Sequence, residues 1–374
     1  MQFNSFHFLC FFPIVIAVYF IIPRKMRYIW LLCASYYFYM SWNPKYALLI
    51  AFSTVVTYLS GLLIGIINEN NGDSSSQLQK SVRLKKWVVA GSFTVNLAIL
   101  FFFKYFDFAL SNVNRILTAV GISMIEKPFD VLLPVGISFY TFQALSYTMD
   151  VYRGDVRAER NILKYALFVS FFPQLVAGPI ERSKNLLSQV EKAHTFQLWN
   201  YNRIANGAVI MLWGYFQKMV IADRVALLVD TVYDKYWLYG STALILASVL
   251  FAVQIYCDFA SYSSIAIGAA EIMGFSLMEN FDTPYFSRSV KEFWRRWHIS
   301  LSSWFRDYLY IPLGGNRKGK VRKYINTMVV FLTSGLWHGA SWNFVVWGGP
   351  TWLFSNSRRT AGSDQTSGEH EAFV

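Results

Sequence analysis

Charged side chains are scarce in this sequence. Only 15% of its 374 residues are Asp, Glu, Lys or Arg, whereas 55% are hydrophobic and 18% are aromatic. This composition excludes an ordinary soluble domain and predicts a polytopic membrane protein. The net charge of +12 comes from short Lys and Arg clusters between apolar runs. Such clusters are typical of cytoplasmic membrane loops, so we expect no nucleic-acid partner.

Cysteine is also rare. Cys10, Cys33 and Cys257 are odd in number, and each lies in an apolar run with no ligand-type residue at a metal-binding spacing. We therefore expect neither a disulfide framework nor a metal site.

Familiar catalytic and targeting motifs are missing as well. No Gly-x-Ser-x-Gly sequence occurs, so a serine nucleophile lacks support. Residues 314–320 match G-x-x-x-x-G-K, but Val321 stands where a P-loop has Ser or Thr. Residues 8–22 lack the basic start and the small-residue end of a cleaved signal peptide, so they are expected to remain as a first span. No internal repeat is present, which weakens an inverted-repeat transporter.

The sequence has instead a series of apolar runs, which predicts an all-α, polytopic transmembrane helical bundle. The runs lie at residues 8–22, 28–42, 46–67, 87–106, 204–222, 243–257 and 324–347, with interrupted runs at 131–149 and 162–180. Basic clusters near Arg24, Lys80 and Arg157 fall on one side of the membrane if each run up to residue 149 crosses it. The positive-inside rule then places these clusters in the cytoplasm and the N-terminus outside. Residues 280–315 are polar and aromatic together, which favours a re-entrant or interfacial segment.

Two histidines are candidates for function because an ionisable side chain is costly in a membrane. His338 lies within the apolar run 324–347, and His298 lies in the re-entrant block. As a general base, His338 would take a proton from a hydroxyl group that attacks an acyl carbonyl. The residues alone are equally compatible with a histidine that is hydrogen-bonded between helices. His298 fits that structural role better than a catalytic one, since it lies close to two arginines.

Other charged residues have competing interpretations. Asp258 is a further candidate charge at membrane depth, and Lys104 lies close enough to one end of its run to reach the interface. The basic residues Arg295, Arg296, Arg306 and those at 317–323 could hold the phosphates of an acyl-CoA donor. Anchoring next to anionic membrane lipid explains residues 317–323 equally well. Asp307 could pair with Arg306 or orient a histidine.

Three long motifs stand out in the C-terminal half of the sequence. They are Trp294-Arg295-Arg296-Trp297-His298-Ile299-Ser300-Leu301-Ser302, Arg306-Asp307-Tyr308-Leu309-Tyr310-Ile311-Pro312-Leu313-Gly314-Gly315-Asn316 and Gly335-Leu336-Trp337-His338-Gly339-Ala340. These motifs resemble those of the membrane-bound O-acyltransferase family. Further similarity lies at residues 34–39, 136–143 and 172–180. The resemblance covers residues 1–349 and is to the branch of membrane components that O-acetylate alginate and peptidoglycan.

The resemblance implies a ring of helices around a central tunnel, which an acyl group crosses from a cytoplasmic donor to an extracytoplasmic acceptor. It implies that His338 is catalytic and that His298 is the second active-site residue. The expected substrate- and donor-binding residues are Arg295, Arg296, Trp304, Arg306, Asp307, Tyr308 and Asp258. Around Asp258 the sequence departs from the family pattern, because Ser261 and Ser264 stand where Gly and Asp are expected.

The predicted function is O-acetyl transfer for an exported polysaccharide such as alginate or peptidoglycan, in the cytoplasmic (inner) membrane of a bacterium. Acetyl-CoA is the expected co-substrate, and no bound cofactor is expected. An exported acetyltransferase or esterase-like partner protein is expected to complete the modification. D-alanyl transfer to teichoic acid and a non-enzymatic role in polysaccharide export are the alternatives.

The resemblance also bears on domain organisation. Residues 1–349 are the expected transmembrane domain, and residues 350–374 are a polar tail that is expected to be disordered. Because further spans are expected after Gly349, this domain is expected to be incomplete at its C-terminal end. A truncated or frame-shifted copy would explain that end, and such a chain is expected to have impaired activity.

Overall fold

The computed structural model describes residues 1–70, 75–127, 133–176 and 178–346. These residues are mostly helical, and the one β-pairing among them is an isolated bridge between Phe281 and Trp297. Four of the described helical stretches are long and apolar enough to cross a membrane, at Pro44–Glu69, Ser76–Ala119, Tyr201–Asp234 and Ser241–Met273. The prediction of an all-α membrane protein is therefore confirmed, whereas the prediction for residues 350–374 lies outside the described residues.

The described helices follow one another with short 3-10 and π segments between them. The α-helices are α1 (Phe6–Ile21), α2 (Arg27–Met40), α3 (Ala47–Glu69), α4 (Ser75–Ala119), α5 (Ile137–Arg153), α6 (Ile162–Ser170), α7 (Phe172–Leu175), α8 (Ser188–Lys192), α9 (Tyr201–Tyr215), α10 (Asp223–Asp234), α11 (Ser241–Met273), α12 (Val290–Arg296), α13 (Ile299–Phe305) and α14 (Gly319–His338). The 3-10 segments are η1 (Arg24–Met26), η2 (Pro44–Tyr46), η4 (Ala193–Thr195), η6 (Tyr236–Leu238) and η7 (Pro284–Phe286). The π segments are η3 (Ser183–Leu187), η5 (Phe216–Ala222) and η8 (Arg306–Tyr310).

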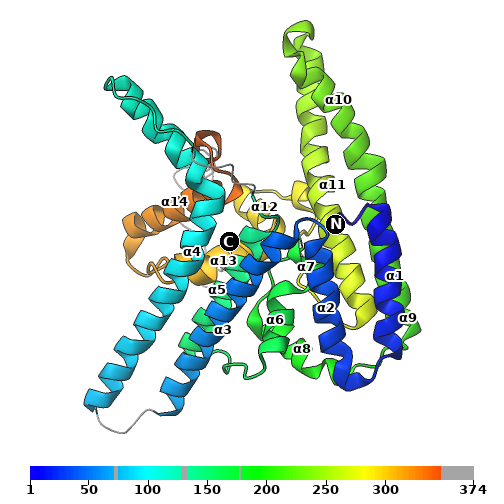
Figure 1. Ribbon diagram of the computed structural model, residues 1–374. Coiled ribbons are helices and arrows are strands. Elements are labelled where there is room, and N and C mark those ends of the chain that lie inside the picture. The colour runs from blue at the N-terminus through cyan, green and yellow to red at the C-terminus, as the bar shows by residue number, and fades with distance from the viewer. Residues whose placement is uncertain (71–74, 128–132, 177, 347–374) are drawn as a thin grey trace, which may run out of the picture.

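The helices form two groups with shorter elements between them. In Figure 1, α3 and α4 run side by side on one side of the molecule, and α1, α9 and α11 lie on the other. The shorter helices α5, α6, α12 and α13 occupy the middle, and the ends of α10 and α11 project beyond the rest (Figure 1). Helix α5 is buried along most of its length and packs against α3, α4 and α6. The centre of the fold is therefore built on a short helix and not on a long span.

The interrupted run at 131–149 is broken where its glycine lies. Gly136 precedes α5 with a φ of 73°, in the left-handed region that favours glycine. The carbonyl oxygen of Leu175 also occupies the place that a Cβ atom at this position would take. The run at 162–180 is broken too, because α6 ends at Ser170 and α7 contains Pro173 near its start. Both interruptions that the sequence predicts are confirmed.

Some boundaries differ from the predictions. The basic cluster near Lys80 lies on α4 itself, because this helix begins at Ser75 and not at residue 87. The predicted run 243–257 is only part of the single helix α11, which has 33 residues and continues to Met273. At about 1.5 Å per residue this helix is longer than the hydrocarbon layer of about 30 Å. An apolar run in the sequence marks only the part of a helix that lies within the membrane. The more polar parts of α4 and α11 were therefore not predicted as helix from apolar runs.

Helices α9 and α11 approach each other closely through glycines. Gly207 and Gly214 on α9 are buried against α11, where Gly268 faces Gly207. A Cβ atom on Gly207 would lie 2.7 Å from the carbonyl oxygen of Gly268. Membrane helices pack through small residues of this kind because their backbones can then approach.

Gly207→Ala is therefore expected to destabilise the α9–α11 pair. The added methyl group has no room, and overpacking of this kind costs about 1–3 kcal/mol. We expect a lower thermal unfolding midpoint for the purified protein in detergent. The matched control is Gly91→Ala on α4, where an added Cβ meets nothing within 4 Å and alanine favours the helix. Equal midpoints for the two variants would contradict the close packing.

Candidate active site

The two predicted histidines lie together although they belong to different elements. His338 is the last residue of α14, and His298 is the residue that precedes α13. The centroids of their rings are 6.5 Å apart, and the Trp337 ring lies 5.9 Å from that of His298. Only 2% of the surface of His298 is exposed. The structure therefore brings together the two histidines that the resemblance implies as active-site residues.

Two cavities adjoin this histidine pair, and both histidines line each of them. The larger cavity, of about 700 Å³, is walled by α4, by the start of α5 and by Phe259 of α11. The smaller space, of about 40 Å³, has Arg306, Tyr310 and Ser334 in its wall. The larger cavity thus offers room for a substrate group beside both histidines.

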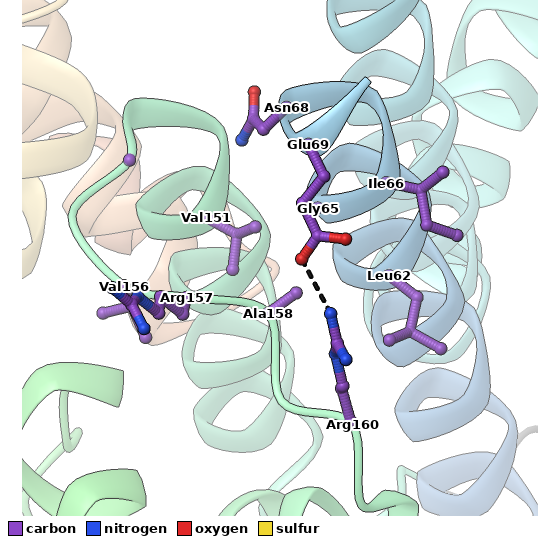
Figure 2. Close-up of a pocket in the computed structure, with 11 residues that line it drawn as sticks. Leu62, Gly65, Ile66, Asn68, Glu69, Val151, Val156, Arg157, Ala158 and Arg160 are labelled. Atoms are coloured by element: carbon purple, nitrogen blue, oxygen red, sulfur yellow. Dashed lines mark hydrogen bonds and ion pairs between the residues drawn. The ribbon is translucent and has the colours of Figure 1, made fainter. Parts of the chain in front are cut away.

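Another cavity of about 690 Å³ lies away from the histidines, between α3 and the segment after α5. Figure 2 shows the ion pair between Glu69 and Arg160 at this cavity, with an N–O distance of 2.7 Å. Both side chains are mostly exposed, and exposed ion pairs contribute about 0–1 kcal/mol. This cavity contains none of the predicted site residues.

His298 is held in an unusual backbone conformation. Its φ is 46°, in the left-handed region that few residues other than glycine adopt. The backbone N–H of Ile299 donates to the carbonyl oxygen of Asn280 at 2.9 Å. The side chain of Asn280 also contacts His298, since its Oδ1 lies 3.0 Å from the ring Nδ1. Strained residues of this kind are held in place by their surroundings and are frequent at active sites.

Asn280 also determines which ring nitrogen of His298 carries the proton. Its Oδ1 accepts from the backbone N–H of Ser300 at 3.4 Å and from the Ser300 hydroxyl at 2.9 Å. Its amide nitrogen donates to the Ser263 hydroxyl at 3.0 Å. Because a backbone N–H can only donate, the atom that faces Nδ1 is an oxygen, and Nδ1 therefore carries a proton.

The other nitrogen of His298 is consequently the basic one. Burial lowers the pKa of His298 well below its usual range, and the nearby His338 lowers it further, so the ring is neutral. Its Nε2 is buried and has no hydrogen-bond partner among the described residues. A neutral ring with a buried lone pair of this kind can accept a hydrogen bond from a reacting group and orient it.

The expected donor-binding residues of η8 differ in their access to the site. Arg306 lines the small cavity beside the histidines, and its Nε donates to Asp307 at 2.8 Å. Asp307 also pairs with Arg182, at 3.4 Å. Tyr308 donates its hydroxyl to Asp150 at 2.6 Å. Arg306 is thus the one residue of the three in the cavity wall, whereas Asp307 and Tyr308 attach η8 to its neighbours.

The remaining expected binding residues line neither cavity that contains the histidines. Arg295 is exposed on α12, and Arg296 pairs with Glu292 one turn earlier on the same helix at 2.8 Å. The indole N–H of Trp304 donates to the carbonyl oxygen of Phe142 at 3.1 Å, and its ring stacks on the Phe142 ring. Trp304 is therefore a packing residue in the described structure.

Asp258 likewise lies outside both cavities. Its carboxylate binds Lys218 of η5, which also contacts Asp223 at 2.9 Å. The charge at membrane depth that the sequence indicates is therefore neutralised by a lysine from the neighbouring helix. Its link to the site is indirect, because the next residue, Phe259, places its ring 4.6 Å from that of His298.

Lys104 is a site residue that the sequence did not indicate. It does not reach toward the interface, because its Nζ donates to the carbonyl oxygen of Trp337 and to the Ser138 hydroxyl. It also lines the larger cavity. The signal that could have found it is a lone lysine within the apolar run 87–106, since such a charge needs a partner.

The apolar run 324–347 is also interrupted at the histidine. Helix α14 ends at His338, and Gly339 is extended, with φ and ψ of −164° and 150°. His338 thus stands at a helix end and not in the middle of a span. This position exposes the carbonyl groups of the last helical turn to partners from other helices.

Two histidines from different elements thus line the same cavities of a multi-pass helical protein, an arrangement that suits acid–base chemistry. The chain belongs to the membrane-bound O-acyltransferase (MBOAT) family, whose model matches residues 156–355. The predicted family is therefore confirmed, and the chain is an acyltransferase by family.

Similar proteins with assigned names support the same family. A protein of Azotobacter vinelandii named "Probable alginate O-acetylase AlgI" is 40% identical over 94% of this chain and 67% of its own length. The peptidoglycan O-acetyltransferase of Helicobacter pylori is 37% identical over 86% of this chain and 62% of its own length. A teichoic acid D-alanyltransferase of Bacillus subtilis is more distant, with 27% identity over 60% of this chain and 58% of its own length. The chain thus spans about two thirds of the length of these relatives or less.

Proposed function

We propose that this protein is an O-acetyltransferase that moves acetyl groups from acetyl-CoA toward an exported polysaccharide such as alginate or peptidoglycan. The observation that carries the proposal is the pair His298 and His338, whose rings are 6.5 Å apart and which together line two cavities. The names of the relatives with 40% and 37% identity support an acetyl group and a polysaccharide acceptor. The D-alanyltransferase is the more distant relative, so acetyl transfer is the preferred chemistry.

The histidines supply the proton transfers of this reaction. A hydroxyl group of the acceptor attacks the acetyl carbonyl carbon of the donor while His338 takes its proton. The thiolate of CoA then leaves, and the imidazolium returns a proton to it. His298, with Nε2 facing the same region, either shares this proton or holds the acceptor. Arg306 in the wall of the small cavity suits the anionic part of the donor.

The same proposal places the chain in the cytoplasmic membrane of a bacterium, with its N-terminus outside. The basic segment η1, the end of α3 and the start of α4 lie at one edge of the molecule, and the tips of α10 and α11 lie at the opposite edge (Figure 1). The positive-inside rule then favours the edge with η1 as cytoplasmic. Donor would enter from that edge, and an exported acetyltransferase or esterase-like partner would receive the acetyl group at the other.

The proposal is tested with membranes that contain the protein and with acetyl-CoA labelled in the acetyl group. We expect release of free CoA that depends on this protein and, when the exported partner is also present, labelled ester in added polysaccharide. Label from a D-alanyl carrier protein and none from acetyl-CoA would support D-alanyl transfer instead. If the folded protein transfers no acyl group, either from acetyl-CoA or from a D-alanyl carrier protein, the result would support a non-enzymatic role and contradict the proposal.

Asn280→Ala is expected to reduce the rate of acetyl transfer by at least about tenfold, as part of the about 10²–10⁴-fold that a positioned acid–base group supplies. Without the Oδ1 acceptor, the Nδ1 proton of His298 loses its partner, and either nitrogen can carry it. Asn280→Asp keeps an acceptor and should retain more activity. The matched control is Asn114→Ala, which removes exposed side-chain contacts to Ile125. If Asn280→Ala and the control have equal rates, the tautomer of His298 is not important.

A further inference from the structure

The last turn of α14 is capped by another helix. The four carbonyl groups of residues 335–338 have no partner within a helix that ends at His338. Gly335 accepts from the backbone N–H of Gly339 at 3.3 Å. Leu336 accepts from the Tyr105 hydroxyl at 2.7 Å, and Trp337 accepts from the Nζ of Lys104. Two consecutive residues of α4 therefore cap two consecutive carbonyls directly before His338.

Lys104 has more contacts than a snorkelling lysine would have. Its Nζ also donates to the Ser138 hydroxyl on α5 at 3.0 Å and lies 5.4 Å from the centroid of the Trp337 ring. A cation at the C-terminal end of a helix is stabilised by the helix dipole. A charge within a spanning helix is otherwise costly, so its placement at this helix end has a physical reason. Lys104 thus joins α4, α5 and the end of α14.

We infer that Lys104 and Tyr105 are positioning residues that fix the imidazole of His338 in the site by holding the last turn of α14. This inference rests on the proposed function for the role of His338, but the clamp itself is a structural property. Helix ends fray when their carbonyl groups lack partners. The catalytic ring is attached to the last residue of such an end, so loss of the clamp lets it move relative to both cavities.

The clamp is first tested without any activity. The full chain in detergent is treated with diethyl pyrocarbonate, and the rate at which His338 is modified is measured by mass spectrometry. Lys104→Met and the double variant with Tyr105→Phe are expected to change this rate several-fold, whereas exposed His194 keeps its rate. Tyr215→Phe is the matched control, because the Tyr215 hydroxyl donates to the Phe3 carbonyl oxygen at 3.0 Å, away from the histidines. Unchanged modification of His338 in folded variants would overturn the inference.

Kinetics then separate a positioning role from a merely structural one. In Lys104→Met we expect kcat for acetyl transfer to fall about 10–100-fold with an unchanged KM for acetyl-CoA, since small displacements of a reacting group have effects of this size. Lys104→Arg keeps donors and charge and should restore much of kcat. Tyr105→Phe removes a single hydroxyl and should reduce kcat less. Lys85→Met, on the same helix but bound to Asn68, should leave kcat unchanged.

Three results would overturn the inference. They are an unchanged kcat in folded Lys104→Met, equal defects in Lys104→Arg and Lys104→Met, or a rise in KM with kcat preserved, which would indicate ligand binding. Size-exclusion chromatography of each variant checks that it is folded. If the natural chain transfers no acetyl group from acetyl-CoA, the proposed function fails, and the modification rate of His338 still decides whether the clamp exists.

Discussion

Membranes that contain the His338→Ala variant are expected to lose acetyl transfer from acetyl-CoA by at least about 10²-fold. A positioned general base supplies about 10²–10⁴-fold in rate, and alanine leaves no group at the end of α14 that can take the proton. The backbone of α14 and the bonds from Lys104 and Tyr105 do not involve the imidazole. The variant should therefore fold, and kcat should fall while the KM for acetyl-CoA changes little.

The control for this variant is His194→Ala. His194 is exposed, and its ring nitrogen contacts the carbonyl oxygen of Glu191 within the same segment. Its replacement should leave kcat within about twofold of the value for the natural chain, as expected for a surface substitution away from the site. If His338→Ala retains the rate of the natural chain at equal protein level, His338 is not the base. His298→Ala then becomes the decisive variant, because the Nε2 of His298 is the other basic nitrogen at the two cavities.

Part of this site was predictable because it depends on residue type. A histidine within an apolar run is costly, and the surrounding motifs identified its family, so His338 and His298 were found together. Arg306, an expected donor-binding residue, lies in the wall of the small cavity beside them. By contrast, the other expected binding residues form bonds away from the cavities, as Trp304 does with Phe142. Sequence gives the presence of an arginine or tryptophan in a motif, but not the direction in which its side chain points.

The residues that were missed act through contacts between distant elements. Asn280 orients His298 because the backbone N–H of Ser300 and the Ser263 hydroxyl fix the orientation of its amide. No local sequence pattern indicates that these three elements come into contact. Lys104 was expected to reach the interface because it lies near one end of its apolar run, yet its partners Ser138 and Trp337 lie on other helices. The end of α14 is similar, since the apolar run continues to residue 347 while the helix stops at His338. Packing and hydrogen bonds decide these features, and apolar character does not.

Asp150→Ala is expected to destabilise the protein by about 3–5 kcal/mol, the largest loss of stability that we predict. Asp150 is 3% exposed, and its carboxylate accepts from the Ser183 hydroxyl at 2.5 Å and from the Tyr308 hydroxyl at 2.6 Å. A hydrogen bond to a charged group contributes about 1.5–3 kcal/mol. Alanine removes both acceptors and leaves the buried Ser183 hydroxyl without one. The expected result is a markedly lower unfolding midpoint in detergent.

The same carboxylate connects the fold to the site. Tyr308 lies between Arg153 and Arg182, whose guanidinium carbons are 5.2 and 5.0 Å from its ring centroid. Because Tyr308 and Arg306 belong to the π segment η8, the bond from Asp150 also holds Arg306 at the small cavity. Asp150→Asn keeps one acceptor and a similar shape, so it should be more stable than Asp150→Ala. In this variant the KM for acetyl-CoA should rise more than kcat falls, because the weakened bond displaces Arg306, the residue proposed to bind the donor, and not the histidines.

The control for stability is Asp107→Ala. Asp107 pairs with Lys127 at 3.0 Å, but its side chain is 54% exposed, and exposed ion pairs contribute about 0–1 kcal/mol. A difference of at least about 2 kcal/mol between the two alanine variants is therefore expected from burial alone. If Asp150→Ala unfolds at the same temperature as Asp107→Ala, the bonds to Ser183 and Tyr308 are not what holds η8. Arg306 would then owe its position at the cavity to the packing of α13 and α14 against η8, and Asp150→Asn would leave the KM for acetyl-CoA unchanged.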